Sequence, residues 1–99
     1  MDDQFQRCCF SITCKTDDLA VVHCLRGLCQ HNVKDWMKQV AWGGTKEPEW
    51  RRAGNQITLR FTSPEQRESF VGDATRLLRT GSWHEVKRSD NDPAHRQRR

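Results

Sequence analysis

The chain has 99 residues, which is enough for one domain with one hydrophobic core. Only 34% of its residues are hydrophobic, but they fall into periodic segments, which argues against wholesale disorder. The net charge of +4 arises mainly in the last residues, so the body of the chain is nearly neutral, which argues against a broad basic surface on the fold. We expect no export signal, because the first residues are polar, and no membrane span, because no apolar run is long enough.

Cysteine is frequent near the N-terminus, at Cys8, Cys9, Cys14, Cys24 and Cys29. The number is odd and no export signal precedes them, so we expect free thiols and a cytoplasmic protein. Buried cysteine behaves as a small hydrophobe, and Cys8, Cys14 and Cys29 fit that role.

The first predicted strand spans Phe5–Thr13. Apolar side chains alternate there with small polar ones, the period that places one face of a strand in a core. Thr16 then provides a helix N-cap, and Asp17 and Asp18 suit the positive end of a helix dipole. Apolar residues follow at helical spacing, so we predict a helix over 17–31.

The next stretch is the least regular part of the chain. Residues 34–43 alternate, but both alternating sets contain apolar members, so a strand is predicted near 37–42 without an assigned inward face. A long connection over 43–55 follows, and it contains the turn pairs Gly43-Gly44 and Gly54-Asn55.

The strongest local signal lies at the start of the second helix. The strand predicted over Gln56–Thr62 alternates apolar and polar residues and leads directly into it. Ser63 is an N-cap residue, Pro64 suits the first helical position, and Gln66 completes a capping box. A helix is therefore predicted to begin at Pro64.

The C-terminal part of this helix carries an apolar stripe as far as Leu78, and Gly81 is suited to the helix C-cap. Trp83–Lys87 is predicted as a short final strand. From Ser89 onward the composition is polar and charged, which predicts a disordered basic tail over 89–99.

Residues 1–88 thus read as one α+β domain with the element order β-α-β-β-α-β. This order predicts a ferredoxin-like βαββαβ two-layer sandwich, with a four-stranded antiparallel sheet and two helices on one face. The other sheet face is left open, and we expect on it Cys9, Ser11, Thr13, Thr58, Arg60 and Thr62.

This open face is the first candidate binding surface. RNA-recognition modules of this topology stack bases on aromatic side chains of the central strands, and no aromatic occupies those positions here. Arg60 lies on this face, and Trp42 and Trp83 can flank it from the edge strands. The alternative is a solvated or dimer-forming sheet surface.

The connection over 43–55 is the second candidate, because Trp50 stands beside Arg51 and Arg52. Exposed tryptophan and arginine are typical of binding hot spots, and they can also stack bases and neutralise phosphates. The alternative is that Trp50 folds back onto the edge of the core while the arginines stay solvated.

Metal binding and catalysis have little support. Cys-x-x-Cys does not occur, and neighbouring Cys and His residues point in divergent directions, so no four ligands converge. Acylphosphatases resemble this chain in element order only, since their glycine-rich phosphate loop has no counterpart in Cys14-Lys15-Thr16-Asp17. We predict no catalytic residue, no metal site and no cofactor.

We therefore expect a small non-enzymatic binding or regulatory module that acts through a protein–protein surface, with a second copy of the chain or another protein as partner and no membrane. The alternatives are an RNA- or DNA-binding domain that uses the open face, the Trp-Arg-Arg segment and the basic tail, and a zinc-thiolate module. The predicted binding residues are Trp50, Arg51, Arg52, Arg60, Trp42 and Trp83.

Overall fold

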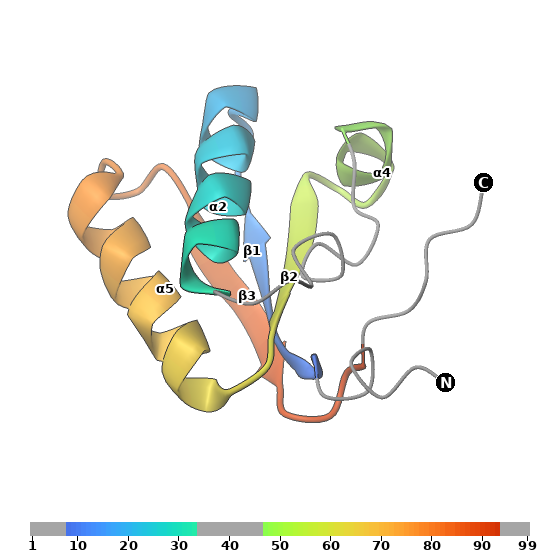
Figure 1. Cartoon of the computed structure of the whole chain (residues 1–99). Coiled ribbons are helices and arrows are strands. Elements are labelled where there is room, and N and C mark those ends of the chain that lie inside the picture. The colour runs from blue at the N-terminus through green and yellow to red at the C-terminus, as the bar shows by residue number, and fades with distance from the viewer. Residues whose placement is uncertain (1–7, 34–46, 94–99) are drawn as a thin grey trace.

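The computed structural model describes residues 8–33 and 47–93, which form the strands and helices of Figure 1. In chain order the elements are β1 (Phe10–Lys15), α2 (Leu19–Asn32), α4 (Glu47–Arg52), β2 (Gln56–Phe61), α5 (Pro64–Leu77) and β3 (His84–Ser89). Within these ranges the fold is α+β, with a three-stranded antiparallel sheet and three helices, which confirms the predicted class. The strand predicted near 37–42 lies outside the described residues.

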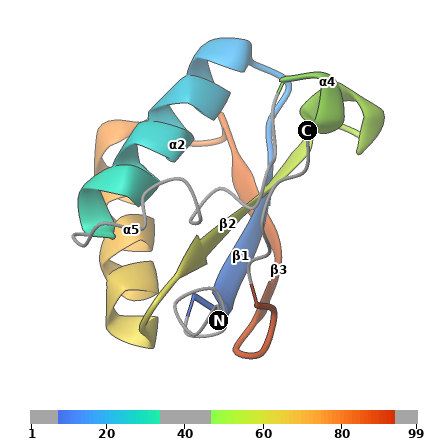
Figure 2. The ribbon, with the colours of Figure 1, turned by 45° about the vertical axis from the view of Figure 1, so that its right-hand side comes forward.

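The sheet has the order β2-β1-β3, so β1 is the central strand. Ser11 faces Arg60 across one ladder and Ser89 across the other, which fixes the register of both pairs. Helices α2 and α5 run side by side in opposite directions on one face of the sheet, as the two views in Figures 1 and 2 show. This is the two-layer arrangement that the apolar stripes predict.

The core lies between the sheet and these two helices. Inward-facing residues of β1 and β2 meet the apolar stripes of α2 and α5, and the Phe61 and Phe70 rings are 5.3 Å apart. The buried hydrophobic residues of this cluster are Ile12, Cys14, Val21, Val22, Leu25, Cys29, Val33, Trp50, Ile57, Leu59, Phe61, Phe70 and Ala74.

The opposite face of the sheet differs from the expectation of an open surface. None of the six residues predicted there is exposed, and Ser11 and Thr13 are buried. Thr13 and Thr58 share a hydrogen bond of 2.9 Å, and Arg60 is only 8% exposed. The expectation of a solvated, freely accessible face is therefore wrong at its centre.

Helix α5 begins as predicted. The Ser63 hydroxyl accepts a hydrogen bond from the Gln66 N–H (3.1 Å), and Gln66 Oε1 accepts one from the Thr62 N–H (3.0 Å). Helix α2 begins two residues later than predicted, because Asp18, not Thr16, is its N-cap and accepts from the Ala20 N–H (2.9 Å). A side-chain oxygen at either position can cap a helix, so local sequence does not choose between them.

Three other boundaries differ from the prediction. Strand β1 starts at Phe10, and the connection over 43–55 contains α4, whose last turn carries Arg51 and Arg52. Helix α5 ends at Leu77, so Gly81 is not its C-cap. Gly81 instead takes a positive φ of 88° in the turn before β3, a conformation that glycine adopts without strain.

Strand β3 also departs from simple alternation. Thr13 faces Lys87 but Cys14 faces Glu85, so Val86 is the extra residue of a β-bulge. The bulge turns Glu85 and Arg88 toward the same face as Cys14, where Arg88 binds both Glu85 and Glu68 of α5. Val86 is left 43% exposed.

Residues 89–93, which the sequence assigns to the tail, lie against the domain. The Asp92 N–H donates to the Cys9 carbonyl (2.8 Å). Buried Arg67 of α5 donates to the Ser89 carbonyl (2.9 Å) and to Asp90 (2.7 Å). The remaining tail positions, 94–99, lie outside the described residues.

Candidate functional site

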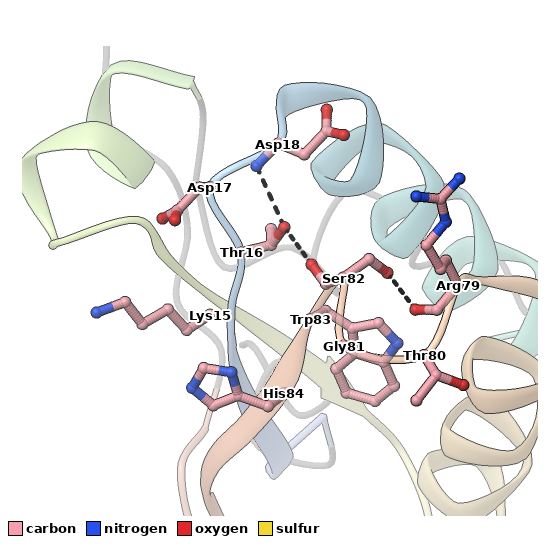
Figure 3. A pocket seen from close by; sticks show the side chains of 10 residues that line it. All are labelled: Lys15, Thr16, Asp17, Asp18, Arg79, Thr80, Gly81, Ser82, Trp83 and His84. Atoms are coloured by element: carbon pink, nitrogen blue, oxygen red, sulfur yellow. Dashed lines mark hydrogen bonds between the residues drawn. The ribbon is translucent and has the colours of Figure 1, made fainter.

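One cavity lies at the end of the sheet where α2 and β3 begin. It has a volume of about 390 Å³ and is lined by residues 15–18 and 79–84 (Figure 3). We call it the Trp83 pocket. Its size falls in the range of about 300–1,000 Å³ that is typical of small-molecule sites.

Two turns form this pocket, and a hydrogen bond joins them. The Thr16 hydroxyl donates to the Ser82 carbonyl (2.7 Å) and accepts from the Asp18 N–H (3.2 Å). The Ser82 hydroxyl donates back to the Arg79 carbonyl (2.7 Å), which closes the turn before β3. The hydroxyls of Thr16 and Ser82 are therefore used to hold the pocket together.

The side chains around these turns divide into two groups. Figure 3 shows Lys15, Asp17 and His84 on one side of the Thr16–Ser82 contact. Arg79, Thr80 and Trp83 lie on its other side. The pocket therefore offers cationic groups at both ends and an indole ring at one of them.

A second, apolar cavity of about 310 Å³ lies between the two long helices. We call it the α2/α5 groove, and it is lined by Cys24, Gly27, Leu28, Leu77 and Leu78. Leu77 is 60% exposed, the highest exposure of any large hydrophobic side chain in the described residues. A Cβ atom added at Gly27 would meet no atom within 4 Å, so the floor of the groove is open there.

Basic residues lie close in sequence to the residues that line this groove. Helix α2 contains no acidic residue, and it contributes His23 and Arg26. Beyond the groove Arg76 is 65% exposed at its side chain, and Arg79 is exposed as well. An apolar strip with basic residues close to it in sequence is thus the main accessible feature of the helical layer.

The predicted binding residues do not come together. Trp50 is 1% exposed and donates from Nε1 to the Thr16 carbonyl (3.1 Å), so its ring is part of the core. Arg51 stacks over the Trp50 ring, 5.0 Å from its centroid, and Arg52 is exposed. This matches the alternative given from the sequence, in which Trp50 folds back onto the core and the arginines remain at the surface.

Of the other three predicted residues, two lie in the described part of the chain, Arg60 on β2 and Trp83 directly before β3. Arg60 donates from Nε and an Nη to Asp92 (2.8 and 3.0 Å), so its charge is already paired. Burial raises the pKa of Asp92, but the hydrogen bond and charge of Arg60, with help from Ser11 and Lys87, outweigh it and leave the pKa lowered. Trp83 lines the pocket that bears its name, and Trp42 lies outside the described residues.

The cysteines show no reactive or metal-binding arrangement. All five are free, and burial raises the pKa of Cys14 to about 12, with Glu85 adding to the rise. Burial likewise raises the pKa of Cys29 well above its ordinary value. Among the described residues, His, Cys, Asp and Glu do not gather in a group that could hold a metal ion.

The sequence pattern missed both cavities. Lys15 and His84 face each other across β1 and β3, a pairing that depends on the bulge at Val86. The groove had a local signal, because Gly27 interrupts the exposed side of a helix and Leu77 follows the end of the buried stripe. Which residues meet across two helices is, however, set by tertiary packing.

The comparisons with known proteins give no relative. No family model, curated protein or solved structure matches this chain. No described helix is long and apolar enough to cross a membrane.

Proposed function

We propose that this chain is a non-enzymatic binding module that docks an amphipathic helix of another protein in the α2/α5 groove. In this proposal the helix presents leucine-like side chains to the groove and acidic side chains to its rim. The observation that carries it is the exposure of Leu77, 60%, beside a groove lined almost entirely by apolar side chains. Exposed apolar strips with a polar margin are typical of protein-binding surfaces.

The choice of an acidic partner follows from the charges near the groove. Arg79 is exposed close to Leu78 in sequence, Arg76 is exposed but bound to Asp73, and α2 has no acidic residue. Asp73 is the acidic residue of this part of α5, and it already binds Arg76 and Asn32. Complementary charges speed the encounter of two proteins and reject partners of the wrong sign. These basic residues also disfavour a second copy of this chain, whose own groove would bring the same charges.

Two broader statements belong to the same proposal. The sandwich is proposed to be ferredoxin-like, and the sheet order β2-β1-β3 and the helices on one face support this assignment. The predicted fourth strand over 37–42 would complete it beside β2. A cytoplasmic location is supported by the five free cysteines, which a reducing compartment maintains.

A nucleic-acid interface on the predicted residues has less support. Trp50 is in the core, so it is not available to stack on a base. Arg60 is bound to Asp92, so a phosphate would have to displace a formed ion pair. The two side chains on which that alternative most depends are therefore already used inside the domain.

The test uses two synthetic helical peptides, each about five turns long, with leucine on one face. One carries glutamate on its polar face, and its twin carries lysine. We expect fluorescence anisotropy to detect binding of the glutamate peptide, weakened by salt, and binding of the lysine peptide at least about tenfold weaker. Equal binding of the two peptides would overturn the proposed partner chemistry.

Two glycines provide a matched pair of variants. Gly27→Gln fills the groove, whereas Gly72→Gln adds the same side chain to open space on α5 outside it. Both changes replace a helical glycine by a better helix former, so both proteins should stay folded. Only Gly27→Gln should abolish peptide binding. Peptide binding that survives Gly27→Gln would place the peptide on another surface. A mass of twice 11.6 kDa in light scattering, restored to the monomer by Leu77→Lys, would mean that the groove binds a second copy of the chain instead.

A further inference from the structure

The Trp83 pocket contains hydrogen-bond donors that the protein itself does not use. Within the described part of the chain, Lys15, Arg79 and His84 form no ion pair or side-chain hydrogen bond, and the Trp83 Nε1–H and Thr80 hydroxyl are likewise unused. These groups come from two segments that are distant in sequence, 15–18 and 79–84, and they meet around one cavity. Lys15, Trp83 and His84 take no part in the α2/α5 groove, whereas Arg79 lies between the two sites.

The acceptors of the same pocket are partly used. Asp17 Oδ1 accepts from the Asn55 side chain (2.8 Å), and Asp18 Oδ1 accepts from the Ala20 N–H (2.9 Å). The Thr16 hydroxyl is used in the contact between the two turns, and the Ser82 hydroxyl is used within its own turn. Donors therefore outnumber acceptors among the groups left for a ligand, which favours a ligand rich in anionic oxygens.

The two ends of the pocket differ in kind. Trp83 is half-buried, and Figure 3 shows its ring beside Thr80, on the other side of the Thr16–Ser82 contact from Lys15. An indole offers a flat face for stacking against a planar ring. Lys15 and His84 supply donors at the opposite end, where the compact charge of the lysine ammonium can bind a phosphate group.

We propose that the Trp83 pocket binds a nucleoside monophosphate, with the base against Trp83 and the phosphate toward Lys15 and His84. The cavity of about 390 Å³ is of the size that such a ligand requires. Asp17 and Asp18 balance the charges of Lys15 and Arg79, so the pocket is nearly neutral and disfavours a ligand with several phosphates. A single phosphate joined to a flat base matches both ends.

The test is a titration of the full chain with adenosine 5′-monophosphate, followed by two-dimensional amide NMR. We expect shifts centred on residues 15–18 and 79–84. Adenosine alone and inorganic phosphate alone should each bind at least about tenfold more weakly, because each lacks the contacts of one end. Adenosine triphosphate should also bind more weakly than the monophosphate. Equal shifts from phosphate alone, or shifts centred elsewhere in the chain, would overturn the proposal.

Variants separate the two ends of the site. Lys15→Met should weaken the monophosphate by about tenfold, the loss expected for one hydrogen bond to a charged group, and leave adenosine unchanged. Trp83→Phe keeps a ring against the core and should weaken both ligands. Arg76→Gln is the control, because Arg76 is a nearby exposed cation outside the pocket. An equal effect of Arg76→Gln and Lys15→Met would mean nonspecific attraction and would reject the site.

Discussion

The indole of Trp50 donates a hydrogen bond to the carbonyl oxygen of Thr16 across 3.1 Å, and this bond joins α4 to the turn between β1 and α2. The same turn is held by the Thr16 N–H, which donates to the Asn55 carbonyl (3.1 Å). Trp50 therefore holds in place the Thr16 turn that lines the Trp83 pocket, and its ring is not offered to a partner.

Trp50→Ala should destabilise the domain by about 3–5 kcal/mol, because it leaves a large cavity in the core. Trp50→Phe keeps most of the buried area and should cost less, with the lost hydrogen bond accounting for about 1 kcal/mol. Urea unfolding measures both. Arg52→Ala is the control, since this side chain is 71% exposed, and it should change the free energy of unfolding by less than about 0.5 kcal/mol. A similar loss in Arg52→Ala and Trp50→Ala would contradict this assignment.

The start of α5 shows what the sequence alone can predict. Ser63, Pro64 and Gln66 act on neighbours within one helical turn, so their pattern is complete in the sequence and the helix begins where it predicts. The alternation of β1 similarly predicts which residues enter the core, and Ile12 and Cys14 are both buried. Local rules succeed here because every group that decides the structure is close in the chain.

Strand β3 and Trp50 show where local rules fail. The bulge at Val86 exists only as a mismatch with β1, which is distant in sequence, and it decides that Lys15 faces His84. The sequence allowed both an exposed and a buried position for Trp50, and the Thr16 carbonyl that accepts its hydrogen bond lies 34 residues away. Both cavities depend on contacts between residues that are far apart in the sequence, so the candidate sites could not be predicted from the local patterns that predict the fold.

Arg67 and Asp90 provide a second test. The Arg67 side chain is only 6% exposed and donates to the Ser11 and Ser89 carbonyls (3.2 and 2.9 Å) and to Asp90 (2.7 Å). Arg67→Met should lower the free energy of unfolding by about 2–3 kcal/mol, because two strand carbonyls lose a charged donor. Asp90→Asn should cost less than about 1 kcal/mol, since Asp90 is 69% exposed at its side chain. Chemical denaturation compares the two, and a larger loss for Asp90→Asn would show that the ion pair, not the carbonyl contacts, holds Arg67.

The buried thiols predict a decline in stability at alkaline pH. Burial raises the pKa of Cys14 from 9.0 to about 12, so the folded state keeps this thiol protonated while the unfolded state releases the proton above pH 9.0. The contribution is fully present below pH 9.0 and is lost toward pH 12, at about 1.4 kcal/mol per pH unit for each such thiol. Urea unfolding across this range should give a shallower decline for Cys14→Ala than for the native chain. Cys24→Ala, at an exposed position, should retain the native decline.

Asp92 predicts the opposite behaviour in acid. Its pKa is lowered from 3.8, because Arg60 outweighs the effect of burial, so the folded state favours the carboxylate. This contribution is present above pH 3.8 and is lost as the pH falls below it. Asp92→Asn should therefore cost up to about 1 kcal/mol at neutral pH, since Asp92 is 40% exposed at its side chain, and should reduce the loss of stability on acidification. An unchanged acid profile in Asp92→Asn would mean that the pairing with Arg60 adds nothing to stability.

Cys24 allows the groove to be examined in the native chain by a chemical label. It is the exposed cysteine among five, whereas Cys8, Cys14 and Cys29 are buried and Cys9 is half-buried near the Asp90 carbonyl. A maleimide should therefore modify Cys24 first, and mass spectrometry after digestion identifies the site. The acidic helical peptide should slow this modification, because it covers the groove that Cys24 lines. A bulky label on Cys24 should in turn block the peptide, whereas a methylthio group, which is small, should not. Modification of Cys24 at the same rate with and without saturating peptide would place the peptide on another surface.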